Sequence, residues 1–477
     1  MPTKPDQLVS ASYFYRVVWR WHFYAGLLVA PFMVMLAITG SIYLFKPQLD
    51  GWMYHNLMFV PPTSPALSQV EQLEAVRSAY PGAELSTFRP AETPERSAEV
   101  GLTTQDGREL TVFVNPANGN LLGNRDETHN LQAYARKLHG ELMLGVIGDR
   151  MIELAACWGL VLMITGLYLW WPRKGSLLWG TLLPRLNSQD RRVFWRDLHV
   201  VPGFYGSLLV VFMILTGLPW SGFWGEQFAN IWSRYPAQVL DNFPKSTLLT
   251  GSLNQSGDKR VPWAVEKLPI PQSDSSGHEA HQGLMQHPTS NSVVAPDGIP
   301  SGTPVNLDSV VALAQAKGVP AGFKVSLPTD PEGVYTVSAA PNNPAEQVTL
   351  HIDQYSGKVL NEVRWAQYGV VPRAVELGIA VHEGRYFGLL NQLLMLFTCL
   401  VVIGLSLTGL VMWWQRRPLG QLGAPPMPKN LPLWKQAVVI IAILGVLFPL
   451  VGLSLLAVLL LDYLVISRIP FLKRALG

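Results

Sequence analysis

Four histidines of this chain stand at two fixed distances from Thr-Gly dipeptides that lie inside long apolar segments. Two of them precede their dipeptide by seventeen residues: His22 before Thr39-Gly40 and His199 before Thr216-Gly217. The other two precede theirs by twenty-six residues: His139 before Thr165-Gly166 and His382 before Thr408-Gly409. Spacing that recurs at four sites indicates an internal duplication with two histidines in each half.

These histidines have the chemistry of metal ligands. Ionisable residues within membrane segments are costly and tend to be functional, and a neutral imidazole is a usual ligand for b-type haem. Two imidazoles on neighbouring helices leave the iron no open position, which suits electron transfer. Zinc would require further ligands at each depth, and no Cys-x-x-Cys-His motif for covalent haem attachment occurs. We therefore expect two haem b groups, each held by two histidines.

Depth along the helices decides which histidines can pair. His22 and His199 begin helices that run outward, so both lie near the cytoplasmic face, whereas His139 and His382 begin returning helices and lie near the outer face. We therefore pair His22 with His199 and His139 with His382. Pairing within one half would separate the two ligands by roughly 25 Å, because seventeen helical residues rise about 1.5 Å each.

Two glycines favour a flat cofactor at the inner pair. Gly26 and Gly203 each follow a histidine by four residues and lie on the same helix face. The absence of a side chain there would let a macrocycle lie against the backbone. Close helix packing explains such glycines nearly as well.

Arginines near the histidines are candidate partners for haem propionates through charge-assisted hydrogen bonds. Arg136 and Arg385 lie close to the outer histidines. The enrichment of positive charges on the cytoplasmic side does not explain arginines at the outer face. Arg20 and Arg196 lie close to the inner histidines, and are better explained as positively charged flanks on the cytoplasmic side.

The composition is that of a membrane protein with sizeable soluble parts. Of the 477 residues, 49% are hydrophobic and 14% are charged, and a membrane helix needs about 20 apolar residues. Apolar runs predict five membrane helices, at residues 23–45, 154–171, 198–225, 386–414 and 437–461. Pro449 interrupts the last run and basic residues follow it, so a re-entrant hairpin is the alternative there.

Lysines and arginines near the helix ends orient the chain. They cluster before the first helix, in residues 173–197 and in residues 416–436, which predicts a cytoplasmic N-terminus in a bacterial inner membrane. The predicted order is residues 1–45 (tail and first helix), 46–135 (first external domain), 136–172 (second helix), 173–197 (loop), 198–225 (third helix), 226–378 (second external domain), 379–415 (fourth helix), 416–436 (loop) and 437–477 (last helix).

Both cysteines fall within helices, so no disulfide framework is expected, and the net charge of +3 suggests no nucleic-acid partner.

The two external segments share one plan. A helix at residues 70–79 precedes strands at 83–89, 98–104 and 110–114, and a helix at 307–317 precedes strands at 324–327, 333–338 and 347–352. Each segment is predicted to be a small α+β domain. Residues 247–304 read as a flexible insertion, whose cluster of His278, His281 and His287 is better explained as solvated linker than as a metal site.

These segments resemble a known family. The meanders that end in "FVNPANGNLLG" and "HIDQYSGKVLN" resemble the PepSY domain, and residues 138–174 and 381–418, with "LHGELMLGV" and "VHEGRYFGLL" at their starts, resemble the PepSY-associated transmembrane helix family. The resemblance implies an α-helical transmembrane bundle with two PepSY-like domains, in an inner-membrane protein of iron uptake similar to haem-containing ferric-siderophore reductases.

Three functions are compatible with these features. The first is a membrane electron carrier that takes electrons from a cytoplasmic reductant or quinol, passes them from the inner haem to the outer one, and reduces a ferric siderophore or other ferric chelate outside. The second is a transporter or permease component, which predicts polar residues within the bundle and broken helices. The third is a non-catalytic binding or regulatory protein built on its PepSY domains.

Overall fold

The computed structural model describes residues 4–62, 65–172, 178–233, 245–254, 261–273, 297–417, 434–466 and 468–469. The chain divides into two compact units, which are described separately here. The helical unit comprises Met1–Leu44, Ala135–Gln227 and Gln392–Gly477. The sheet unit comprises Phe45–Tyr134 and Phe228–Asn391.

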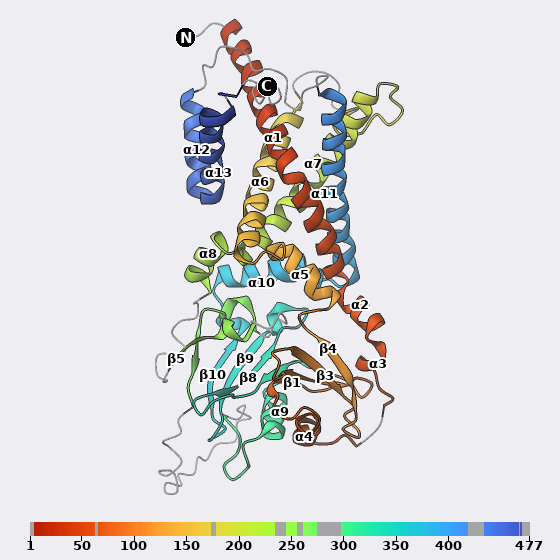
Figure 1. The fold of residues 1–477 in the computed structure, drawn as a ribbon, viewed down its shortest axis with the longest axis vertical. Helices are drawn as coiled ribbons and strands as arrows, with labels where there is room; N and C mark the ends of the chain where they lie inside the picture. Colours follow the sequence, from red (N-terminus) through yellow and green to blue (C-terminus); the bar gives the residue numbers. More distant parts are fainter. Residues whose placement is uncertain are drawn as a thin grey trace. The chain divides into compact units, whose positions relative to one another are not determined.

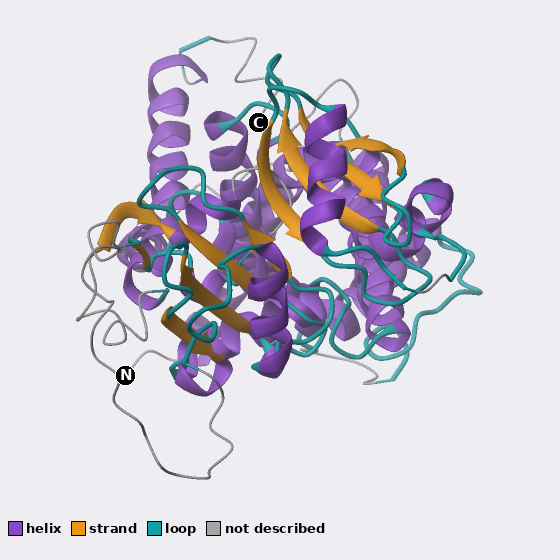
Figure 2. Ribbon diagram, turned by 90° about the horizontal axis from the view of Figure 1, so that it is seen from below, coloured by secondary structure: helices purple, strands orange, loops and turns teal. Residues whose placement is uncertain are grey.

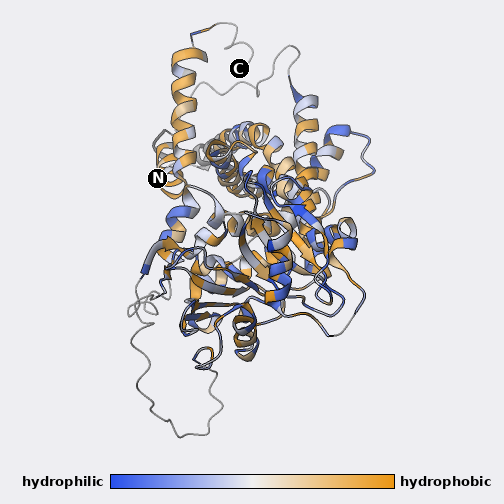
Figure 3. Ribbon diagram, turned by 60° about the horizontal axis from the view of Figure 1, so that its bottom comes forward, coloured by the Kyte–Doolittle hydropathy of each residue, from blue (hydrophilic) through white to orange (hydrophobic). Residues whose placement is uncertain are grey.

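The helical unit is built on four long apolar helices. They are α1 (Lys4–Leu44), α6 (Val146–Trp170), α7 (Arg191–Gly217) and α11 (Leu389–Arg416), and they lie side by side in Figure 1. Over the described residues, the stretches Phe14–Leu44, Val146–Trp170, Arg191–Trp220 and Leu389–Arg416 are long and apolar enough to cross a bilayer. Their ribbons carry mostly hydrophobic colours in Figure 3. The chain is therefore a membrane protein with four candidate spans.

Small residues allow these helices to approach one another closely. A Cβ added to Gly159 of α6 would lie 3.0 Å from Cδ1 of Ile214 of α7, and one added to Gly206 of α7 would lie 2.6 Å from Cγ1 of Val401 of α11. Such contacts are typical of membrane bundles, where van der Waals packing rather than the hydrophobic effect holds helices together.

The fifth predicted membrane helix is not one helix. Residues 437–461 form a hairpin of two short helices, α12 (Trp434–Leu447) and α13 (Pro449–Leu461). Pro449 cannot continue an α-helix because it lacks a backbone N–H and its ring clashes with the preceding turn. A Cβ added to Gly452 would lie 2.6 Å from Cα of Gly445, so two glycines permit the close return. The single crossing is wrong and the hairpin alternative describes this segment.

The hairpin packs against α6. The indole Nε1 of Trp158, near the middle of α6, donates a hydrogen bond to Oγ of Ser454 at 3.1 Å. Each hairpin helix has 13 or 14 residues, which span roughly 20 Å and fall short of a hydrocarbon core about 30 Å thick. The hydrogen bond therefore places the middle of α13 beside the middle of α6.

The sheet unit contains one continuous eight-stranded sheet, in the order β10-β9-β8-β7-β1-β2-β3-β4, with all pairings antiparallel. The strands are β1 (Glu84–Arg89), β2 (Ala98–Thr103), β3 (Glu109–Val114), β4 (Leu121–Asp126), β7 (Lys324–Ser326), β8 (Val334–Ala339), β9 (Val348–Asp353) and β10 (Val359–Arg364). β1 pairs with β7, with Thr87 opposite Ser326 and Phe88 opposite Val325.

The prediction of two separate α+β domains is therefore wrong in one respect. Each segment does form a helix followed by a four-stranded meander, but the two meanders join through their first strands. The pairing satisfies backbone groups that would otherwise form two exposed sheet edges. The two helices, α4 (Gln69–Ala79) and α9 (Leu307–Ala316), share one hydrophobic core with the sheet and lie in front of its strands in Figure 2.

Other elements complete the described chain. They are α2 (Lys46–Met53), α3 (His55–Met58), α5 (Leu131–Glu141), α8 (Trp224–Trp232), α10 (Val370–His382), β5 (Lys245–Leu249) and β6 (Pro269–Pro271), together with short 3₁₀ and π turns.

Part of the predicted flexible insertion, residues 247–304, is folded. β5 pairs with β6, and Trp263, which is 2% exposed, belongs to a second core of the sheet unit. The backbone N–H of Ala264 donates to the buried carboxylate of Glu376 at 3.0 Å. Short turns separate these apolar residues, so they show neither strand nor helix periodicity. The cluster of His278, His281 and His287 lies outside the described residues.

Candidate cofactor-binding site

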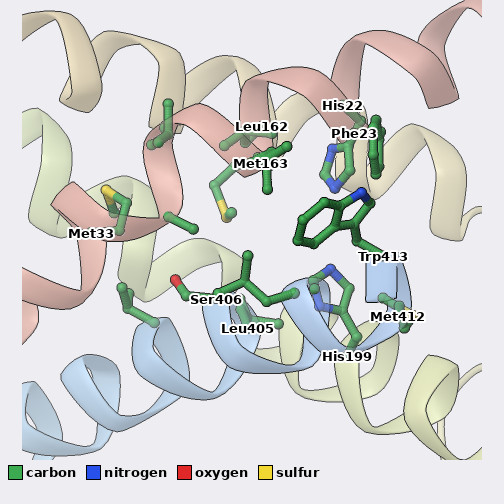
Figure 4. Close-up of a pocket in the computed structure, with 18 of the residues that line it drawn as sticks. His22, Phe23, Met33, Leu162, Met163, His199, Leu405, Ser406, Met412 and Trp413 are labelled. Carbon is green, nitrogen blue, oxygen red and sulfur yellow. The ribbon is translucent and has the colours of Figure 1, made fainter. Parts of the chain in front are cut away.

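His22 of α1 and His199 of α7 face each other inside the helical unit (Figure 4). Their ring centroids are 6.4 Å apart and the ring planes are nearly perpendicular, at 87°. An imidazole nitrogen binds a transition metal at about 2 Å, so two imidazoles on opposite sides of one iron have centroids roughly 6 Å apart. The spacing of this pair is thus the spacing that a single iron between them requires.

A threonine of a neighbouring helix holds each of these imidazoles. Nδ1 of His22 lies 2.9 Å from Oγ1 of Thr165 in α6, and Nδ1 of His199 lies 2.9 Å from Oγ1 of Thr408 in α11. Both threonine hydroxyls donate their own proton to the carbonyl four residues earlier, each at 2.7 Å. The hydroxyl oxygen is then the acceptor, and Nδ1–H of each histidine is the donor. This tautomer leaves a lone pair on Nε2, the nitrogen available to a metal.

The glycine after each threonine makes room for the imidazole. A Cβ added to Gly166 would lie 3.2 Å from Cε1 of His22, and one added to Gly409 would lie 3.6 Å from Cε1 of His199. We call each Thr-Gly pair with its imidazole a histidine socket. The sockets explain why Thr-Gly accompanies the histidines in the sequence.

His139 occupies a third socket. Its Nδ1 lies 3.0 Å from Oγ1 of Thr39, and a Cβ added to Gly40 would lie 3.3 Å from its Cε1. Thr39 is seventeen residues beyond His22 on α1, so His139 lies near the opposite end of that helix. His382 ends α10 in the sheet unit. The pairing of His139 with His382 therefore stays a prediction.

A cavity of about 180 Å³ opens beside His22 and His199, between α1, α6, α7 and α11. One water requires only about 10–15 Å³ by such a measure, so the space suits a larger group. The walls are mainly apolar and include Met33, Leu162, Met163, Val210, Val402 and Leu405. Among the described residues, no carboxylate lines this cavity.

The two glycines predicted to receive a macrocycle differ. Gly26 lines the cavity, and the nearest atom to an added Cβ is Cδ2 of Leu162 at 3.8 Å. An added Cβ at Gly203 would instead meet Cδ2 of Leu405 at 3.2 Å. Gly26 thus leaves the cavity open, whereas Gly203 serves close helix packing.

The predicted outer arginines do not share one environment. Arg136 is exposed on α5. Arg385 donates hydrogen bonds to Oε2 of Glu383 at 2.6 Å and to the carbonyl of Pro341 at 3.0 Å. Their assignment to propionates stays a prediction.

Three residues at one end of the cavity were not among the predicted site residues. Trp413, Arg416 and Arg417 of the α11 end line the cavity, and Figure 4 shows Trp413 beside the two histidines. The repeat counterpart of Trp413, Trp170, stacks on Phe204 with centroids 3.9 Å apart and donates to the carbonyl of Thr181. The same Trp-Trp motif therefore has different neighbours in the two halves of the chain. The sequence motif alone does not show which tryptophan lines the cavity.

The residues present fit a flat, largely apolar group with a metal at its centre. The two imidazoles, whose Nδ1 atoms contact threonines, would offer Nε2 to the metal, aliphatic and methionine side chains form the walls, and a glycine leaves one wall open. Haem b has this shape and these requirements.

Comparison with known proteins places the chain in a family. No curated protein matches it significantly. A family model described as the PepSY-associated TM region matches residues 19–416, which include all four histidines. The chain therefore belongs to the PepSY-associated TM region family.

Proposed function

We propose that the protein carries electrons across a bacterial inner membrane and reduces a ferric chelate, such as a ferric siderophore, on the outer side. In this proposal His22 and His199 hold one haem b near the cytoplasmic side, where the N-terminus lies. His139 and His382 hold a second near the outer side. Electrons come from a quinol or a cytoplasmic reductant, and each ferric ion that takes up one electron becomes ferrous and binds its oxygen-rich chelator far less strongly.

The facing arrangement of His22 and His199 carries the proposal. A structural histidine needs a hydrogen-bond partner at each buried nitrogen, and here the threonine hydroxyls engage Nδ1 of each ring. The two rings meet over an apolar cavity at the separation that one metal ion requires.

Bound haem would supply one-electron transfer at an iron with no open coordination position. The chain's own residues orient and protect it. Thr165 and Thr408 hold both imidazoles in the tautomer that presents Nε2, and the aliphatic walls exclude water. No side chain has to move a proton at this site.

Two buried carboxylates of the helical unit accept structural hydrogen bonds. Glu153, which is 1% exposed, accepts hydrogen bonds from the backbone N–H groups of Phe223 and Trp224. Asp197, also buried, accepts from Arg185 and Arg196 at 2.7 and 2.6 Å. Both acids have structural partners of the kind that a helix terminus or a loop needs.

The sheet unit is the proposed receptor for the chelate. Its two helix-and-meander halves have the plan expected of PepSY-like domains, and their joined sheet forms one surface rather than two.

A reduced-minus-oxidised visible spectrum of the detergent-purified chain tests the proposal. We expect two low-spin b-type haems per chain, and we expect His199→Ala to lose one of them. His129→Ala, which removes an exposed histidine of the sheet unit, is the matched control and should keep both. A colourless protein, or a His199→Ala variant with two intact haems, would contradict the proposed ligation.

A further inference from the structure

We propose that Arg416 and Arg417 bind the two carboxylates of the tetrapyrrole that the cavity receives, and so fix its orientation. This inference rests on the proposed function of the same cavity. It replaces the inner arginines considered from the sequence, Arg20 and Arg196, with a pair at the C-terminal end of α11.

The arginines among the described lining residues of the cavity lie at one end of it. Along α11, Gly409 packs against His199, and Arg416 follows seven residues later, roughly 10 Å further toward the end of the helix. Along α1, Met33 lies eleven residues beyond His22, roughly 16 Å in the opposite direction. The histidines therefore stand between a basic end and an apolar end of the same cavity.

Two other arginines of the helical unit, Arg185 and Arg196, share one carboxylate partner. Asp197 lies 2.7 Å from Nε of Arg185 and 2.6 Å from Nη2 of Arg196. Arg196 also donates to the carbonyl of Gly180 at 3.1 Å. The guanidinium of Arg196 is thus bound to the segment that precedes α7.

Arg416 and Arg417 differ from these arginines. Among the described side chains, no Asp or Glu forms an ion pair with either of them. The charges that act on Arg416 are those of Arg192 and Arg196, which have the same sign. The guanidinium of Arg417 lies over the ring of Trp414, with Cζ 3.4 Å from its centroid. Like charges gathered at the mouth of an apolar cavity are unfavourable until an anion joins them.

The ligand that this arrangement recognises is planar, apolar over most of its area, and carries two carboxylates at one edge. Arginine binds carboxylates through paired N–H donors and does so better than a point charge. The carboxylate edge would face Arg416 and Arg417, and the opposite edge would face Met33 and Val210.

Comparison of haem with haem dimethyl ester tests the inference on the full chain. The chain is produced without haem, purified in detergent and titrated with either form, and binding is followed by the absorbance of the ligated iron. Because charge-assisted hydrogen bonds are stronger than neutral ones, we expect the unmodified chain to prefer haem by about tenfold or more. Arg416→Gln with Arg417→Gln should bind the ester as before and lose the preference.

Two further variants test whether the preference for haem depends on arginines that line the cavity or on any nearby positive charge. Arg192→Gln removes one nearby positive charge that does not line the cavity, and it should keep the preference. Arg416→Lys with Arg417→Lys should restore part of it. A lower haem reduction potential in the double glutamine variant is a second expected signature, because a positive charge near the carboxylates is lost.

Each outcome bears on a different claim. Equal affinity of the unmodified chain for haem and its diester would overturn this inference and leave the proposed function intact. Loss of preference in Arg192→Gln to the same extent as in the double variant would also overturn it, since general charge would then suffice. Failure of the unmodified chain to bind either compound would overturn the proposed function itself.

Discussion

Nδ1 of His22 lies 2.9 Å from Oγ1 of Thr165, although 143 positions separate the two residues in the chain. His199 and Thr408, 209 positions apart, repeat the contact at the same distance. In each case a histidine of one long helix is held by a threonine near the end of another. The contact sets the imidazole tautomer and ties two helices of one half together.

Thr408→Val should weaken haem binding at the inner site by about tenfold to a hundredfold, the usual effect of losing a ligand's hydrogen-bond partner. The substitution keeps the side-chain shape and removes the acceptor for Nδ1–H of His199. Haem titration of the detergent-purified chain measures the effect. Thr398→Val is the matched control, because Thr398 lies in the same helix and bonds only the Leu394 carbonyl in the described structure. Equal behaviour of both variants would show that the socket does not orient the ligand.

Gly166→Ala should displace His22 and lower the haem content to about one per chain. The added Cβ would lie 3.2 Å from Cε1 of the imidazole, and overpacking of this kind typically costs about 1–3 kcal/mol. Pigment analysis with a protein assay gives the stoichiometry. Gly404→Ala adds the same methyl group in α11, where nothing lies within 4 Å of it, and should retain two haems. If both variants retain two, the glycine is not needed for the socket.

The α12–α13 hairpin predicts that Ile469 lies on the same side of the membrane as the loop between α6 and α7. The two helices are too short to cross separately, and in Figure 1 they open toward the end of the bundle where α1 begins. Cysteines introduced by Ile469→Cys and Asn187→Cys should react alike with an impermeant thiol reagent, and Asn118→Cys in the sheet unit should react from the other side. The two native cysteines are buried and give little background. Labelling of residue 469 together with residue 118 would establish a full crossing instead.

The sheet around His351 should lose stability as the pH falls below 6.5, the ordinary pKa of a histidine. Burial lowers the pKa of His351 from 6.5 to about 4, and the residue is 2% exposed in β9. The unfolded chain then binds more protons than the folded chain between these values, so stability is complete above about pH 6.5 and declines toward pH 4. The decline between pH 7 and pH 5 is about 2 kcal/mol.

Hydrogen exchange of the amides in β8 and β9, corrected for intrinsic rates, measures this decline. His351→Gln should reduce the pH dependence of protection even if it lowers stability at every pH. His129→Gln changes an exposed histidine and should leave the dependence unchanged. Identical slopes for the unmodified chain and His351→Gln would rule out this residue as the cause.

Secondary structure was predictable where burial produces a clear period. The helices α4 and α9 and the strands β1, β2, β3, β7, β8 and β9 lie within a few residues of their expected positions. Within the eight-stranded sheet, the two strands that were not predicted, β4 and β10, are its two edges. An edge strand has one neighbour and tolerates polar residues, so its sequence carries a weaker strand signal.

By itself the sequence determined the four long apolar helices and the duplication, because hydrophobic length and residue spacing are properties of each segment alone. Only the tertiary structure decided which threonine receives which histidine, that Arg416 and Arg417 line the cavity, and that two meanders share one sheet. These features depend on the rotation of one element against another. A periodic pattern shows which face of a helix is apolar, but the side chains that meet are set by the packing of all the elements together.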